Sequence, residues 1–291
     1  MSTIGLNLVE ASKLSQDVLQ KGVILTMATA SPVLEKLPFM EITGNGYSYN
    51  LVDELPTVGF RQVNAGYTES GATVSRETEH LVILGGDVDV DLFIAKTRGN
   101  INDVRAIQTE LKAKATAKAF EKNFFMGDTS SDANAFDGLA KRLEKGKGTK
   151  IEKALSLDAL NELLDAVEGG ADVLYMDKST RREVMKLLQT SNHYIEQGQD
   201  AFGRMVAKYG DVEIRAIEDG LVERNHIYAV KFGAEQYVAG LTNGGIQVMD
   251  LGQLETKPCF RTRIEFYCGI AVFHPKAFAV LTGTLGRAKT K

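Results

Sequence analysis

Residues 102–127 read NDVRAIQTELKAKATAKAFEKNFFMG, the longest uninterrupted helical pattern in the chain. Asn102 and Asp103 predict a capped start. Gly127 predicts an end in the left-handed conformation that glycine tolerates. A helix over residues 102–126 would be roughly 36 Å long, which is the width of a whole domain.

This helix carries two apolar stripes, whereas a helix on a protein surface needs one. The first stripe follows helical spacing through Val104, Ile107, Leu111, Ala115 and Ala119. The second, nearly opposite, contains Ala106, Ala113, Ala117, Phe120 and Phe124. A polar strip between them holds Asp103, Glu110, Lys114 and Glu121. We therefore expect a helix packed on both sides: the first stripe on the sheet of its own domain, and the second stripe on the N-terminal arm or a long hairpin, of the same chain or of a neighbouring copy.

The composition is that of an ordinary globular protein. The chain has 291 residues, 44% hydrophobic and 25% charged, with a formal net charge of −4. That balance argues against a protein built to wrap nucleic acid, which is usually strongly basic. No apolar run reaches the length of a membrane span, and the N-terminus lacks a secretory signal. Cys259 and Cys268 lie in one apolar, strand-like segment and are expected to be buried thiols.

The first third of the chain predicts an arm followed by a long hairpin. Residues 1–36 look helical and have little core of their own, with Pro32 suited to a first helical position. Alternation from Tyr47 to Val52 predicts a strand, Val58 and Phe60 a second short one, and His80 to Asp91 a third that breaks at Gly85-Gly86. Residues 44–84 would thus form a two-stranded excursion. Because an isolated hairpin is marginal in water, we expect it to lie across a neighbouring subunit.

Residues 151–250 predict a mixed α/β unit. Ser156 and Asp177 begin two amphipathic helices, and apolar strands are expected at 171–176, 212–217 and 227–232. Strand patterns return at 259–273 and 277–285.

The sequence holds no recognisable catalytic, cofactor or metal motif. Gly44-Asn45-Gly46 lacks a third glycine, and residues 146–150 (GKGTK) lack Walker A spacing. His80, His193, His226 and His274 share no metal spacing. Asp87, Asp89 and Asp91 lie on one strand face, where a solvated surface is expected; whether they bind a cation at an interface stays open. We predict a protein that is not an enzyme and has no catalytic, cofactor-binding or metal residues.

Several short motifs occur in a distinctive order along nearly the whole chain. They are Ser31-Pro32-Val33-Leu34 before Leu37-Pro38-Phe39, Gly46-Tyr47-Ser48-Tyr49, the helix 102–126, Met126-Gly127-Asp128 with residues 134–139 (NAFDGL), and residues 269–275 (GIAVFHP). In this order and spacing the chain resembles the major capsid proteins of tailed bacteriophages, the HK97-like fold family.

The resemblance implies an α+β fold with named parts. These would be an N-terminal arm (1–40), an E-loop hairpin with flanking P-domain strands (41–100), the P-domain spine helix and following loop (101–150), an A domain (151–252) and C-terminal P-domain strands (253–291). It also implies a structural protein that assembles, in the host bacterial cytoplasm, into hexamers and pentamers of an icosahedral phage head around double-stranded DNA. No cofactor or membrane is implied. The DNA would be enclosed without sequence-specific binding, and a portal and a decoration protein are possible further partners.

Two departures from the family pattern carry expectations. Some members cross-link through an E-loop lysine, but no lysine occurs between Lys36 and Lys96, so a non-covalent shell is expected. Some members begin with a scaffolding segment; here Met1 nearly begins the arm, which favours a separate scaffolding protein. Two alternatives remain: an encapsulin-type shell of the same fold, and an α/β enzyme with a site assembled within 151–250.

Overall fold

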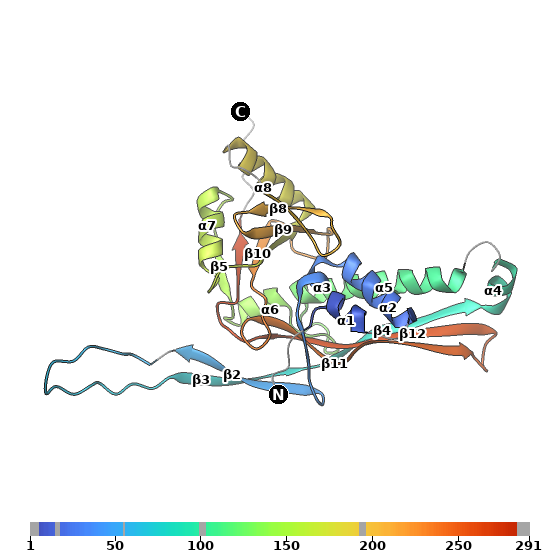
Figure 1. The fold of residues 1–291 in the computed structure, drawn as a ribbon, viewed down its shortest axis with the longest axis horizontal. Coiled ribbons are helices and arrows are strands. Elements are labelled where there is room, and N and C mark those ends of the chain that lie inside the picture. Colours follow the sequence, from blue (N-terminus) through green and yellow to red (C-terminus); the bar gives the residue numbers. More distant parts are fainter. Residues whose placement is uncertain (1–5, 15–17, 55, 99–102, 192–195, 284–291) are drawn as a thin grey trace.

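The computed structural model describes residues 6–14, 18–54, 56–98, 103–191 and 196–283. Helix α5 (Val104–Met126) is its central element (Figure 1). One side of α5 packs on a four-stranded sheet, its C-terminal end meets a seven-stranded sheet, and the N-terminal helices lie along it. These helices are α1 (Leu8–Leu14), α2 (Val18–Ala30) and α3 (Pro32–Lys36).

The four-stranded sheet has the order β1-β11-β12-β4. Its strands are β1 (Phe39–Glu41), β11 (Val238–Gln253), β12 (Cys259–Val272) and β4 (Val82–Asp91). The long strands β4, β11 and β12 are antiparallel, and β1 joins β11 in parallel. An aromatic cluster around Phe120 fixes α5 to this sheet, with ring centroids 6.0 Å from Phe39 and 5.9 Å from Phe266.

The seven-stranded sheet has the order β5-β13-β10-β6-β9-β8-β7. Its strands are β5 (Thr149–Ile151), β6 (Val173–Asp177), β7 (Glu196–Gln199), β8 (Met205–Tyr209), β9 (Val212–Ile217), β10 (His226–Val230) and β13 (Phe278–Thr282). Helices α7 (Leu157–Asp165) and α8 (Lys178–Thr190) share one apolar core on one face. The other face turns Tyr175 and Tyr228 toward Phe125 of α5.

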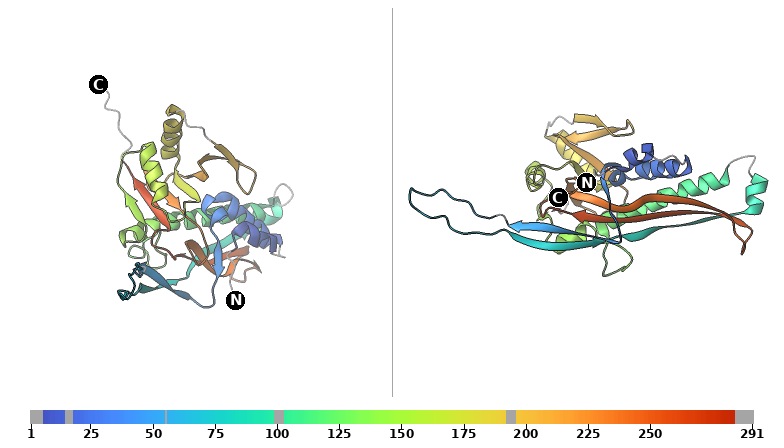
Figure 2. Two further views of the ribbon diagram at one scale, coloured as in Figure 1. Left: turned by 60° about the vertical axis from the view of Figure 1, so that its left-hand side comes forward. Right: turned by 60° about the horizontal axis from the view of Figure 1, so that its bottom comes forward.

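A long hairpin extends away from the two sheets. Its strands are β2 (Gly46–Glu54) and β3 (Thr73–His80), which pair antiparallel with Gly46 opposite His80. Figure 2 shows the hairpin projecting to one side, while β4, β11, β12 and helix α4 (Leu92–Arg98) project to the other. Helix α6 (Leu139–Glu144) lies near the base of the hairpin.

The long helix differs from its prediction in two respects, at Gly127 and at Glu121. Asp103 caps the N-terminus by accepting from the Ala106 amide, but Asn102 lies outside the described residues. Gly127 is not left-handed, since its φ is −60° and its ψ 139°. It is needed because a Cβ there would lie 2.2 Å from the Phe136 carbonyl oxygen. Glu121, predicted on the wet strip, is 2% exposed.

The two apolar stripes have unequal roles. The second stripe is buried from Ala113 onward and contacts the chain's own sheet and N-terminal helices. The first stripe stays largely exposed, with Ile107 at 43% and Leu111 at 53%. The second stripe therefore packs on the N-terminal helices as predicted, whereas the prediction that the first stripe is buried on the sheet is wrong within one chain.

Three strand predictions also need correction. Residues 56–72 form no strand around Val58 and Phe60. Strand β4 runs through Gly85-Gly86 without a break, because Gly85 lets β12 approach: a Cβ there would be 2.2 Å from the Ile264 carbonyl oxygen. Strand β11 pairs with β12 in the four-stranded sheet, although its residues were predicted to belong to the 151–252 unit. Strand β13 joins the seven-stranded sheet, although it was predicted to complete the sheet of the P domain.

Across the described ranges, no helix combines the length and apolar character that a membrane crossing needs.

Candidate functional site

The tip of the hairpin presents large apolar side chains to solvent. Val58, Phe60 and Val63 are 90% exposed or more, and Tyr67 is 70% exposed. Inside the loop, the Ser70 hydroxyl donates to the Thr57 carbonyl at 2.8 Å. Burying one such side chain against another surface stabilises by about 1.5–3 kcal/mol. The tip is therefore suited to contact another chain.

The base of the hairpin is held by one buried arginine. Arg142, on α6, donates to both carboxylate oxygens of Glu79 on β3, with Nη2 to Oε2 at 2.8 Å. The same guanidinium donates to the carbonyls of Ile270 at 3.0 Å and Asp137 at 2.9 Å. Each of the three guanidinium nitrogens of Arg142 donates to a partner, and Arg142 is only 3% exposed. A buried bidentate arginine–carboxylate pair of this kind fixes the relative orientation of the two side chains as well as their distance.

Aromatic side chains complete the anchor. The Tyr49 hydroxyl donates to the Val272 carbonyl at 3.0 Å, and burial raises the pKa of Tyr49 well above its ordinary value. The Tyr49 ring meets Phe273 edge-on with centroids 4.7 Å apart, and Tyr47 packs beside both. The hairpin therefore has a fixed base and an exposed tip.

The three aspartates of β4 are paired with protein groups. Asp89 accepts two hydrogen bonds from Arg261 at 2.6 Å each, and Asp87 accepts from Arg263 at 2.7 and 3.0 Å. These hydrogen bonds lower the pKa of both carboxyls. Asp91 instead accepts from the Phe93 amide at the start of α4. Within the described parts of the chain, no group of three or more His, Cys, Asp or Glu residues is arranged to hold a metal ion.

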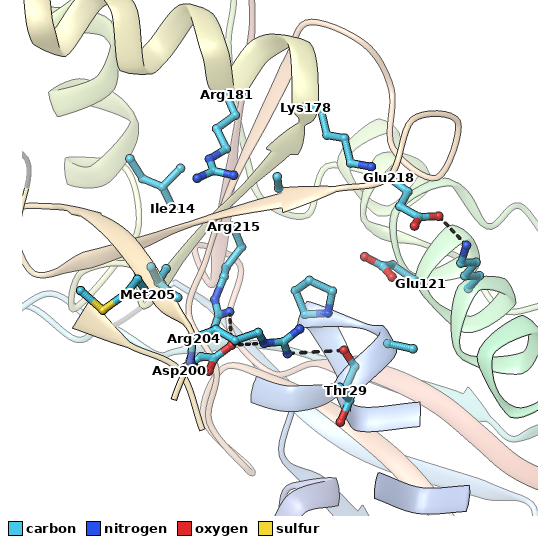
Figure 3. A pocket seen from close by; sticks show the side chains of 15 residues that line it. Thr29, Glu121, Lys178, Arg181, Asp200, Arg204, Met205, Ile214, Arg215 and Glu218 are labelled. Carbon is cyan, nitrogen blue, oxygen red and sulfur yellow. Dashed lines mark hydrogen bonds and ion pairs between the residues drawn. The ribbon is translucent and has the colours of Figure 1, made fainter. Parts of the chain in front are cut away.

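A polar cavity of about 310 Å³ lies between the N-terminal helices, α5, the start of α8 and the β8–β9 strands (Figure 3). Its lower wall is a closed charge network centred on Arg215. Arg215 Nη2 donates to Glu35 at 3.0 Å, Nη1 to Asp200 at 3.2 Å and Nε to Glu213 at 3.1 Å. This network fastens α3 to the seven-stranded sheet.

Glu121 enters the same cavity from α5, with Lys178 and Arg181 facing it from α8 (Figure 3). Its Oε1 atom is buried and has no hydrogen-bond partner among the residues described. Burial raises the pKa of Glu121 to about 7, against the lowering effects of a Ser31 hydrogen bond and of Lys118.

The histidines, glycines and cysteines that the sequence did not support as functional sites have separate surroundings in the structure. His226 pairs with Glu223 at 3.1 Å, and His274 lies 3.5 Å from Glu168; His80 ends β3, and His193 lies outside the described residues. Gly146 and Gly148 adopt positive φ in a turn. Cys259 and Cys268 are both buried and free, as expected, and burial raises the pKa of Cys268.

The functional residues that sequence reasoning missed are Arg142, Arg215 and Glu121. Arg142 and Glu79 are 63 positions apart, and Arg215 and Glu35 are 180 apart. No local spacing signals such pairs. For Glu121, the adjacent buried Phe120 was a hint that this face of α5 turns inward.

Comparison with known families gives two overlapping matches. The phage capsid family model matches residues 90–283, which is more than half of the chain. The model of the major capsid protein GP7 matches residues 16–155. A comparison with curated proteins finds no match.

Solved structures share the fold over most of the chain. The holo-SrpI encapsulin complex of Synechococcus elongatus PCC 7942 has a TM-score of 0.67 at 18% identity, covering 87% of this chain and 88% of its own. The Microbacterium phage Oxtober96 structure gives 0.65 at 16% identity, with 87% and 91% covered. The Mycobacterium phage Bobi structure gives 0.64 at 13%, with 87% and 90% covered. At these identities the likeness establishes a shared α+β HK97-like fold.

Proposed function

Because the chain belongs to the phage capsid family, we propose that its anchored hairpin is the element that reaches a neighbouring copy in the shell. The protein itself is a structural major capsid protein of the phage head, not an enzyme, and its copies assemble into an icosahedral shell. We further propose that the copies form hexamers and pentamers, and that the shell encloses double-stranded DNA.

The proposed parts keep the names that the resemblance implies. Residues 1–40 would act as the N-terminal arm, the β2–β3 hairpin as the E-loop and α5 as the spine helix. Sheet membership supports placing β11 and β12 in the P domain, and β5 and β13 with the A domain. The boundaries near residues 238 and 278 would then follow the sheets and not the chain order.

One observation carries the assembly proposal. The hairpin combines a saturated, buried base at Arg142 with a tip whose apolar side chains are almost fully exposed. In a solitary protein that tip would lack any partner for its apolar surface. A contact between the hairpin of one copy and a different surface of the next is heterologous, and such contacts close into rings.

The test replaces the apolar tip without touching the base. The double variant Val58→Ser/Phe60→Ser is expected to fold normally but to lower the assembled fraction at least about tenfold, since one lost apolar contact already corresponds to that factor. The matched control is Glu69→Gln, a polar change in the same loop. Size-exclusion chromatography and electron microscopy measure assembly. Shells formed by the double variant as readily as by the wild type would contradict the proposal.

The encapsulin alternative differs in contents. The fold is common to both kinds of shell, but the matching family models are those of phage capsids. We therefore propose that purified particles contain DNA and no enclosed enzyme. Nuclease-protected nucleic acid would support a phage head, and a stoichiometric protein cargo without DNA would support an encapsulin.

Further partners are proposed only because a major capsid protein is expected to need them. A separate scaffolding protein, a portal and, in some shells, a decoration protein would bind this chain during or after assembly. The net charge of −4 supports a wall that encloses DNA without gripping it.

A further inference from the structure

Helix α8 carries a stripe of cations that its own fold compensates only in part: Lys178 and Arg181 also line the polar cavity with Glu121, whereas Arg182 and Lys186 do not. Lys178, Arg181, Arg182 and Lys186 share one side of the helix and line a groove of about 540 Å³. Asp219 is the acidic residue in that groove. Within the described ranges none of the four cations forms an ion pair. Lys178, Arg182 and Lys186 are exposed, and Arg181 is half-buried.

The positions of these cations are unfavourable for the stability of helix α8. Lys178 and Arg181 occupy the first turn of α8, where the helix dipole favours acidic side chains; the acid at this end of the helix is the N-cap residue Asp177. Lys178, Arg182 and Lys186 follow one another at four-residue spacing, so neighbouring like charges repel. The stripe therefore does not stabilise α8 and calls for an anionic partner from outside the chain.

A complementary surface lies at the opposite end of the same layer. Asp165, Asp172 and Asp211 line a second hollow, of about 530 Å³, between the end of α7 and the β8–β9 turn. All three are exposed, and neither Asp165 nor Asp211 has an ion-pair or hydrogen-bond partner among the described residues. Asp172 accepts from the Phe232 amide at 2.8 Å.

The two surfaces are separated along parallel strands. Asp172 directly precedes β6 and Lys178 directly follows it, so roughly 17 Å of strand divides them. Asp211 likewise precedes β9, which is parallel to β6, and Asp219 lies beyond its other end. The acidic hollow thus lies at one end of the strands and the cationic helix at the other.

We infer that the cationic stripe of α8 on one copy docks into the acidic hollow of the next, and that this head-to-tail contact closes the ring of a capsomer. The long lysine and arginine side chains of the stripe can reach into a hollow lined by short carboxylates. Different surfaces meet in each contact, which is the arrangement that generates rings. This inference rests on the proposed assembly of the chain into a shell.

Charge reversal tests the contact on the full-length chain. The double variant Arg182→Glu/Lys186→Glu, and separately Asp165→Lys/Asp211→Lys, should each lower the assembled fraction at least about tenfold, because like charges then face each other. The matched control Lys122→Glu reverses an exposed cation on α5 and should stay within about twofold, as isolated surface charges contribute little. Thermal unfolding of the unassembled chains checks that each variant folds.

The combined variant, with all four substitutions in one chain, should restore assembly because the acids introduced on the stripe then face the lysines introduced in the hollow. A one-to-one mixture of the two double variants should restore only rings with an even number of copies, since the variants must alternate. Negative-stain microscopy distinguishes these rings from closed shells. Recovery in the combined variant is the result that a merely structural defect would not give.

Three outcomes overturn the inference. They are normal assembly of the Arg182→Glu/Lys186→Glu variant, failure of the combined variant to recover, and normal assembly with loss of co-purifying nucleic acid, which would identify DNA as the partner of the stripe. A wild-type chain that never assembles would instead overturn the proposed function on which the inference rests.

Discussion

Glu121 is a carboxyl group that the fold removes from water while leaving one oxygen unpaired. Burial raises its pKa from 4.5 to about 7. The unfolded chain therefore releases this proton near pH 4.5, whereas the folded chain holds it until about pH 7. Between these values the folded state binds more protons, so the free energy of unfolding falls as the pH rises.

Replacing Glu121 by Gln removes this titration. At pH 8 the variant is expected to be more stable than the wild type by up to about 3 kcal/mol, because a neutral amide needs no buried charge. At pH 4.5 the two should be nearly equal. Denaturant unfolding at both pH values measures the difference, with Glu110→Gln on the exposed side of α5 as the control. An unchanged pH dependence in Glu121→Gln would show that another group is responsible.

Arg142 supports a second prediction because its removal would strand Glu79 in the anchor of the hairpin. Arg142→Ala is expected to lower the free energy of unfolding by about 3–5 kcal/mol, the usual penalty for breaking a buried charge pair. Lys145→Ala, one turn later and half exposed, should change it by less than about 1 kcal/mol. Hydrogen exchange of the β3 amides locates the effect. Protection of β3 equal to the wild type in Arg142→Ala would contradict the proposed anchoring.

The end of α5 depends on the close approach of two backbone segments. The Gly127 amide donates to the Asn123 carbonyl at 2.9 Å, and its carbonyl accepts from the Gly138 amide at 2.9 Å. Gly138 is as confined as Gly127, since a Cβ on it would lie 2.5 Å from the Asn123 carbonyl oxygen. The helix thus stops because residues 127–138 fold back against its last turn, and not through a left-handed residue.

Two glycine-to-alanine changes should therefore have opposite effects. Gly127→Ala is expected to destabilise the chain by at least about 2 kcal/mol, since the new Cβ meets rigid backbone. Gly22→Ala should stabilise it by about 0.5–1 kcal/mol, because Gly22 is inside α2 and nothing lies within 4 Å of the added atom. Thermal unfolding compares them. A loss of stability in Gly22→Ala equal to that in Gly127→Ala would refute the distinction.

Local signals predicted the beginnings of helices well. Asp103, Ser156 and Asp177 each accept a hydrogen bond from the amide three residues ahead, as predicted, and Ser31 does the same before Pro32. Strand β2 and a two-stranded excursion over residues 44–84 were also predicted, but the returning strand β3 was not among the predicted strands. Such features depend on neighbours in sequence, which one chain displays directly.

Contacts between distant segments were beyond the sequence. The apolar alternation of β13 is the same whichever sheet it enters, and its pairing with β5 and β10 instead of β12 is decided in space. The stripes of α5 were visible and the N-terminal helices cover the one expected, but the exposure of the first stripe within one chain was not foreseen. The same limit hid Arg142 and Arg215, whose partners come from other elements. The fold class thus followed from the family resemblance that the order of motifs carries, while the anchor and the cavity required coordinates.

The whole chain lacks the groups that would tie copies together covalently at the hairpin. No lysine occurs between Lys36 and Lys96, so neither strand of the hairpin nor its tip offers an amine. Cys259 is 7% exposed and Cys268 fully buried, which keeps both thiols from a neighbouring copy. Burial also raises the pKa of Cys268, so it is not a reactive thiolate at neutral pH. We therefore expect copies to be held together by packing and charge alone.

Purified shells boiled in detergent without reductant should accordingly migrate as one band at the mass of a single chain. The physical reason is that detergent unfolds each copy and leaves no bond between them. A parallel sample with reductant is the control for disulfides. A ladder of high-mass bands in both samples would reveal a cross-link through some other residue, and bands lost on reduction would show that shell assembly exposes Cys259.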